Sequence, residues 1–152
     1  MEASFEIHAS TRALLLKSVQ DLSLDQVNYM PKNFKNTIAW NCAHIVVTQQ
    51  ILSYKLSSNK LLVEASFVEK FKKGTVVEQA VEQEEWLEIC QLLASTHLEL
   101  KKDYEAKLFK QFEEYPTSYG YVLRNIEEAI QFNNVHEALH LGYIMSMKKS
   151  LI

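Results

Sequence analysis

The sequence predicts an all-α protein that forms one domain, a four-helix bundle over residues 1–152. Composition gives the first reason, because the chain has only three glycines and two prolines, whereas a β-sandwich or barrel of this size needs many more turn residues. Apolar residues make up 47% of the chain, and its length is sufficient for one buried core. The second reason is that apolar residues recur at helical spacing in four long segments.

The first two helical segments are separated by a break near Pro31. The first segment covers about residues 4–19. Its apolar stripe consists of Phe5, Ala9, Ala13, Leu16 and Val19. Since proline disfavours a continuous helix, we expect the second helix to begin after it. Asn36 is the expected N-cap, and the helix runs to about Leu56.

A long link, residues 57–74, connects the second segment to the third. Its sequence FVEKF, residues 67–71, predicts a short helical piece. Thr75 followed by Glu78 has the spacing of a capping box, so we expect the third helix to run from Thr75 to about Phe112. The core stripe of that helix consists of Trp86, Ile89, Cys90, Leu93, Leu100, Tyr104 and Leu108.

The last helix follows the clearest turn in the chain, the sequence YPTSYGY of residues 115–121. Asn125 and Glu128 form a second capping-box pair, and the helix continues almost to the end of the chain. Short connections make neighbouring helices antiparallel, but the link over residues 57–74 is long enough to cross the bundle. The pattern alone leaves the topology open.

The distribution of charge argues against a nucleic-acid-binding protein. The net charge is −3 and the lysines are scattered, whereas nucleic-acid binders concentrate positive charge on one face. No segment approaches the roughly 20 apolar residues of a membrane span, and the acidic N-terminal segment does not resemble a signal peptide. Cys42 and Cys90 are isolated, as expected for thiols in a reducing compartment. We therefore expect a cytoplasmic protein with no nucleic-acid or membrane partner.

His136 and His140 form an H-x-x-x-H motif in the last helix. Four residues turn a helix by about 400°, so both rings project from one face and can bind a single ion. The same stripe carries Ala129, Phe132, Tyr143 and Met147, and we expect this face inside the bundle. Two buried histidines without partners are costly, and a metal ion removes that cost. A pair at this spacing also arises by chance, so it is not sufficient evidence alone.

His44, on the second helix, is the candidate third ligand. Asn41 and Thr48 flank it where an ordinary core helix has aliphatic residues, and both are candidates to support the ligands from outside. Three histidines from two helices leave a coordination position open, as catalytic sites do. Imidazole donors suit zinc, nickel, copper or iron and disfavour magnesium and calcium. We expect one divalent transition metal ion, zinc or nickel.

The sequence HEALH also matches the H-E-x-x-H motif of zinc proteases. We reject that class because no Glu, Asp or His follows His140, because Tyr143 occupies the position of the motif's glycine, and because no strand is predicted to bind a peptide. Glu137 projects about 100° away from His136. We expect it either to support the ligands from outside or to face solvent.

These motifs resemble the DinB/YfiT superfamily, specifically its DinB-like members. The resemblance depends on NTIAWNCAHI (residues 36–45), FVEKFKKGT (67–75) and EEAIQFNNVHEALHLGYI (127–144), and covers nearly the whole chain. It implies a left-handed four-helix bundle with an up-down-down-up course, in which the long link is the crossover between the second and third helices. It also implies that His44, His136 and His140 are the metal ligands, that Gly142 allows close helix packing, and that the chain forms a homodimer.

The resemblance leaves the reaction open. Characterised members of the superfamily include metal-dependent transferases and isomerases that use bacillithiol, mycothiol or glutathione, whereas others have no established reaction. We expect a metal-dependent enzyme, a thiol-dependent S-transferase or hydrolase acting on a small molecule. The alternatives are a non-catalytic, metal-stabilised stress protein and a binding or dimerisation module with a vestigial site. The sequence identifies no catalytic residue.

Overall fold

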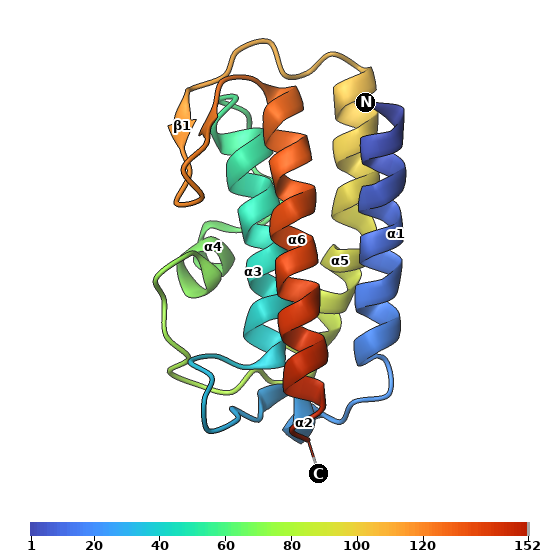
Figure 1. Cartoon of the computed structure of the whole chain (residues 1–152), viewed down its shortest axis with the longest axis vertical. Helices are drawn as coiled ribbons and strands as arrows, with labels where there is room; N and C mark the ends of the chain where they lie inside the picture. Colours follow the sequence, from blue (N-terminus) through green and yellow to red (C-terminus); the bar gives the residue numbers. More distant parts are fainter. Residues whose placement is uncertain (152) are drawn as a thin grey trace.

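The computed structural model describes residues 1–151 and is mostly helical, as predicted. Figure 1 shows four long helices side by side. They are α1 (Glu2–Val19), α3 (Ile38–Gln50), α5 (Gln83–Glu105) and α6 (Ile126–Lys148). The shorter elements are α2 (Leu24–Asn28), α4 (Ala65–Phe71), the π-helix η1 (Ile51–Lys55) that continues α3, and the strands β1 (Tyr115–Pro116) and β2 (Val122–Leu123).

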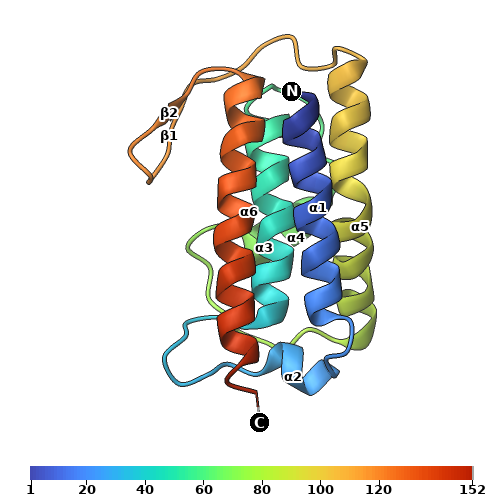
Figure 2. The same ribbon diagram turned by 45° about the vertical axis from the view of Figure 1, so that its right-hand side comes forward.

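Each long helix packs against two others. Helix α1 contacts α5 and α6, and α3 contacts the same two helices from the other side. Helices α1 and α6 begin at the upper end in Figure 1, whereas α3 and α5 begin at the lower end. Helix α4 and the β1–β2 hairpin lie beside α3 and α6, away from α1 and α5 (Figures 1 and 2). Within residues 1–151, no helix combines the length and apolarity needed to cross a membrane.

The buried face of α1 differs from the predicted apolar stripe. Its buried residues are Phe5, His8, Arg12, Leu15 and Val19. The predicted positions Ala9 and Leu16 are only half-buried, and Ala13 is exposed. The prediction was wrong because two polar side chains take core positions on this helix, and hydrophobicity alone assigns them to the surface. On α6, Tyr143 is likewise exposed rather than in the core.

The starts of α3 and α6 are set by side-chain caps. Thr37, not the predicted Asn36, caps α3, and its hydroxyl accepts the Trp40 N–H at 3.1 Å. Asn125 caps α6 as predicted, with its side chain accepting the Glu128 N–H at 2.8 Å. The Glu128 carboxylate accepts the Arg124 N–H instead of closing the capping box on Asn125.

The start of α5 is a second correction, because Thr75 and Glu78 do not begin a helix. The chain continues without regular structure to Gln83. The Thr75 hydroxyl donates to the carbonyl of Lys72 at 2.9 Å and accepts from the Trp40 indole at 3.0 Å, and it caps no helix. The short helix α4 contains the predicted FVEKF segment.

Helix α5 also ends earlier than predicted, at Glu105 rather than near Phe112. Lys107 has a φ of 57°, a left-handed conformation that ends a helix, and Leu108 is exposed. The predicted turn over residues 115–121 is present, and it joins two short antiparallel strands that the sequence reading lacked. The Thr117 and Gly120 amides form the hydrogen bonds that close this hairpin.

Candidate metal centre

Two neighbouring helices bring His44, His136 and His140 together. One ring nitrogen of each lies within 4.8 Å of the others, and the three form a group that could hold a metal ion. The Nε2 atoms of His136 and His140 are 3.1 Å apart. Nitrogens that share a tetrahedral ion at zinc–nitrogen bond length lie about 3.4 Å apart, so the α6 pair already has the separation that one ion requires.

Hydrogen bonds orient two of the three rings. His44 donates from Nδ1 to the carbonyl oxygen of Phe71 at 2.7 Å, and His140 donates from Nδ1 to the Asn41 side-chain oxygen at 2.7 Å. Both bonds leave Nε2 as the unprotonated nitrogen, which is the atom that binds a metal. The Nδ1 of His136 has no partner within residues 1–151.

Asn41 can serve as this acceptor because its own amide group is fixed. Its Nδ2 donates to the Thr37 carbonyl at 2.8 Å and to the Asn36 side chain at 3.0 Å. The side-chain oxygen is therefore turned towards His140. Thr48 is also at the site, with its hydroxyl 3.2 Å from the Nε2 of His44.

Burial keeps the three rings neutral. Burial and the neighbouring His140 ring lower the pKa of His136 to about 3, and burial and His44 lower the pKa of His140 to about 4. Burial also lowers the pKa of His44, although its hydrogen bond to Phe71 acts in the opposite direction. Metal ligation requires neutral imidazole, so the donors are in the required state at neutral pH. The residues present therefore fit a divalent transition metal.

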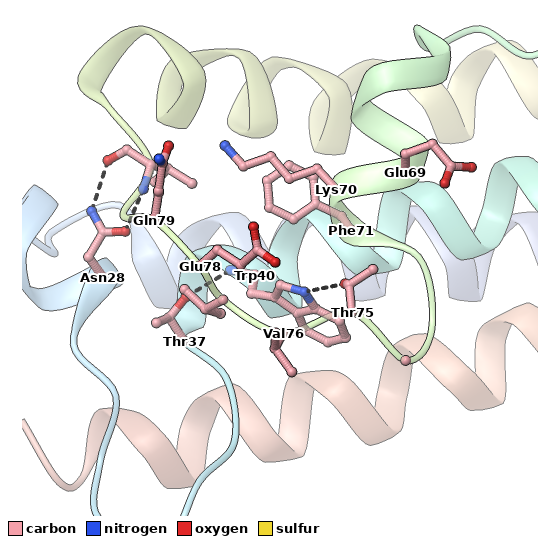
Figure 3. Close-up of a pocket in the computed structure, with 13 residues that line it drawn as sticks. Asn28, Thr37, Trp40, Glu69, Lys70, Phe71, Thr75, Val76, Glu78 and Gln79 are labelled. Atoms are coloured by element: carbon pink, nitrogen blue, oxygen red, sulfur yellow. Dashed lines mark hydrogen bonds between the residues drawn. The ribbon is translucent and has the colours of Figure 1, made fainter.

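Trp40 holds His44 from behind. The two rings stack at a centroid distance of 4.5 Å and an interplanar angle of 12°. Figure 3 shows the indole N–H directed at Thr75, and Trp40 also lines a cavity of about 660 Å³ together with residues 74–79 and Val81. This cavity is the larger of two near the site, but none of the three histidines lines it. The cavity adjoins the triad only through Trp40 and Phe71, which line it and also hold His44 in place.

A smaller cavity, of about 320 Å³, opens directly beside the triad. Its walls combine the three histidines with apolar groups, hydroxyl groups and one lysine. The further lining residues are Thr48, Ile51, Leu52, Lys73, Tyr115, Thr117, Ser118 and Phe132. They come from α3, η1, α6, the segment after α4 and the hairpin, so five parts of the chain enclose the space in front of the ligands.

Glu137 does not face solvent and forms no hydrogen bond with a ring of the triad. It is fully buried, and its carboxylate pairs with Arg12 at 2.7 Å and 2.9 Å and with His8 at 2.9 Å. Burial raises the pKa of Glu137, but Arg12 and His8 outweigh that effect and hold the pKa well below its usual range. The turn of about 100° from His136 thus directs Glu137 into the bundle core.

This buried network is the part of the molecule that sequence reasoning missed. Arg12 also donates to the Leu93 carbonyl, the Thr96 hydroxyl and the Gln49 side chain, so all five of its N–H groups are used. The sequence does contain a signal for this buried face. The buried residues of α1, including His8 and Arg12, follow helical spacing as regularly as the predicted apolar stripe does.

Comparison with protein families identifies the group to which the chain is similar. A model of the DinB superfamily matches residues 8–144 and so includes all three histidines of the triad. No curated protein matches the chain.

Proposed function

This chain belongs to the DinB superfamily, and from that membership and the three-histidine group we propose that it binds one divalent transition metal ion, zinc or nickel, and acts as an enzyme on a small thiol. The ligands are His44, His136 and His140. The reaction is a thiol-dependent S-transfer or a hydrolysis. The single observation that carries the catalytic part is the cavity of about 320 Å³ in front of the ligands, since a purely structural site would be closed.

A bound divalent ion would act as a Lewis acid that lowers the pKa of a thiol beside it. The chain's own groups prepare this position. Phe71 and Asn41 hold the rings of His44 and His140 with Nε2 towards the cavity. The hydroxyl of Thr48, beside His44, can accept a hydrogen bond from the reacting group or donate one to it. Ile51, Leu52 and Phe132 give the cavity an apolar wall, which limits water there.

The second candidate is a metal-stabilised protein without turnover. It is favoured by the burial of the three rings, since a metal that binds only the folded state adds its binding free energy to stability. A third reading, a binding or dimerisation module with a vestigial site, is disfavoured because all three ligands are in place and hydrogen bonds orient two of them, His44 and His140.

The wider architecture is part of the same proposal. The helix directions in Figure 1 support an up-down-down-up bundle, with residues 57–74 as the crossover between α3 and α5. We further propose a cytoplasmic homodimer. The exposed apolar side chains of Ile7 and Leu14 on α1 and of Leu139 on α6 support the dimer, and the free thiols of Cys42 and Cys90 are compatible with the cytoplasm.

Metal analysis of the purified protein tests the ligand assignment. We expect about one equivalent of a transition metal in the native protein and almost none in the His136→Ala variant. The matched control is His97→Ala, which removes a partly buried histidine outside the triad. If His136→Ala retained the metal, the assignment would be wrong.

Activity assays separate the enzyme from the metal-stabilised protein. Thiol transfer and hydrolysis are measured after a chelator has removed the metal and again after the metal has been restored. Only the enzyme shows turnover that follows the metal.

A further inference from the structure

The cavity beside the triad has a marked charge asymmetry. Lys73 is the only lining residue with a permanent charge, and no carboxylate of residues 1–151 lines the cavity. Histidine binds a metal as neutral imidazole, so a divalent ion on the three rings would keep its full charge of +2. With Lys73 the cavity would carry about three positive charges and no compensating negative one.

The neighbouring lysines differ from Lys73 because each is paired with a carboxylate. Lys70 is paired with Glu85 and Lys72 with Glu69, so both have a carboxylate partner outside the cavity. Lys73 has no carboxylate within 4.0 Å in residues 1–151, and it lies close enough to the triad to contribute to the lowered pKa of His44. A lysine without a partner at the mouth of a positively charged cavity is available for an anion.

Hydroxyl groups complete the polar wall. Thr117 and Ser118 come from the hairpin and Thr48 from α3, whereas Ile51, Leu52 and Phe132 are apolar. Lys73 and the Ser118 hydroxyl can donate hydrogen bonds to carboxylate oxygens, whereas the Thr117 hydroxyl already donates to the Tyr121 carbonyl within the hairpin. The apolar wall suits the short hydrocarbon part of a ligand between its carboxylate and the metal position.

We propose that this cavity selects small thiols that carry a carboxylate, and that Lys73 recognises the carboxylate. The inference rests on the proposed function and adds the substrate class to it. Because Lys73 is exposed, its contribution is that of a partly screened ion pair, roughly fivefold in affinity, and it decreases as salt is raised.

Two probes of equal size test this inference on the cobalt-loaded protein, 3-mercaptopropionate and its neutral amide. The sulfur-to-cobalt absorption band reports the binding of either one. The preference for the acid is defined as the Kd of the amide divided by the Kd of the acid. This ratio is compared between variants, so that intrinsic differences between the two thiols cancel. We expect Lys73→Met to lower this preference roughly fivefold. Lys73→Arg should keep it, as should Lys72→Met, the matched control.

The possible outcomes separate the inference from the proposed function. If neither probe produced the absorption band, thiol binding at the metal would be disproved and the proposed function with it. If both probes bound but Lys73→Met left the preference unchanged, only the role of Lys73 would be overturned, and direct chelation by the probe's carboxylate would account for any selectivity. Loss of the preference in Lys73→Arg as well as Lys73→Met would also overturn recognition by charge.

Discussion

Arg12 and Glu137 form an ion pair in which both side chains are fully buried. Removing one partner of such a pair leaves an uncompensated charge in the core, at a cost of about 3–5 kcal/mol. We therefore expect Arg12→Met and Glu137→Leu each to lower the free energy of unfolding by about that amount, measured by chemical denaturation. The double variant should lose less than the sum of the two, because neither charge remains.

An exposed pair gives the control for this cycle. Lys70→Met removes one partner of the Lys70–Glu85 pair, which lies at the surface, and should cost less than about 1 kcal/mol. Strict additivity of the two core substitutions would show that Arg12 and Glu137 stabilise the fold independently.

Asn41 would act on a metal bound at the proposed site through its hydrogen bond with His140. We expect Asn41→Ala to weaken metal binding about 10- to 100-fold, because the His140 ring loses the acceptor that fixes its orientation and its protonated nitrogen. A competition titration with a chromophoric chelator measures the change. Asn134→Ala is the matched control, since Asn134 binds the Ser4 carbonyl on α1, away from the triad. Equal affinities of Asn41→Ala and the native protein would remove Asn41 from the site.

The neutral triad also makes the stability of the metal-free protein depend on pH. The pKa of His136 is about 3 and that of His140 about 4 when folded, against about 6.5 unfolded. Between pH 6.5 and 4 the unfolded chain therefore binds more protons, so stability is complete above pH 6.5 and is lost as pH falls. The slope is at most about 1.4 kcal/mol per pH unit for each histidine.

Denaturation of the metal-free protein at pH 7, 6 and 5 measures this slope. The variant with both His136→Gln and His140→Gln should have a flatter dependence than the native protein. An unchanged slope would mean that other groups cause the loss of stability.

At the scale of elements, the β1–β2 hairpin is attached to the bundle but depends on its own turn. Gly120 has a φ of 85°, a conformation that costs a residue with a side chain about 1–2 kcal/mol. We expect Gly120→Ala to loosen the hairpin while the helices keep their stability, and hydrogen exchange of the Thr117 and Gly120 amides should report it. Gly142→Ala is the control, because Gly142 is helical and an added Cβ there contacts nothing. Equal exchange rates in the two variants would contradict a strained turn.

The open space around Gly142 also corrects an expectation drawn from the family resemblance. Since a Cβ at this position would have no atom within 4 Å, the glycine does not permit close packing of helices within one protomer. Its surroundings become relevant only where a second chain covers this face of α6.

The elements also show how far sequence reasoning extends. The four long helices and α4 were predictable because apolar spacing and caps such as Asn125 are local signals. The start of α5 was not predictable, because the Thr75 hydroxyl binds the Trp40 indole of a distant helix. The buried face of α1 was not predictable either, because Arg12 is compatible with the core only when Glu137 of α6 lies opposite it. Predictions failed where a tertiary partner decides the outcome.

At the scale of the whole molecule, α1 and α6 present a mostly apolar surface, with Glu6 as the one charged residue that lines the groove between them. The exposed residues of α6 on this surface are Gln131, Val135, Ala138, Leu139, Gly142, Met145 and Ser146, and those of α1 are Ala3, Ile7, Ser10 and Leu14. A groove of about 460 Å³ runs between the two helices past Ile7, Leu14 and Leu141. Such an apolar surface is typical of an interface.

The flanking charges are complementary in the way that the proposed dimer, with a second copy of the chain as the partner, requires. Glu6 lies near the start of α1 and Lys17 near its end, both exposed at the edge of this surface. A two-fold axis perpendicular to the helices would reverse the direction of α1 in the partner, so Glu6 of one chain would meet Lys17 of the other at both ends of the interface. A lipid surface is disfavoured because the surface lacks the flanking cluster of basic residues that membrane binding requires.

We therefore expect Leu139→Glu to convert a dimer into a monomer, measured by sedimentation equilibrium, with helical content and metal binding unchanged. The substitution places a charge at the centre of the apolar contact, where it would be buried without a partner. Leu98→Glu is a close control, since Leu98 is 58% exposed and Leu139 57%, but Leu98 lies on α5, which contacts α1 and α3 rather than α6.

Exchanging the charges, with Glu6→Lys and Lys17→Glu together, should preserve the dimer, whereas either substitution alone should weaken it. A native protein that sediments as a monomer, or a dimer that Leu139→Glu leaves intact, would exclude this face as the interface between two copies.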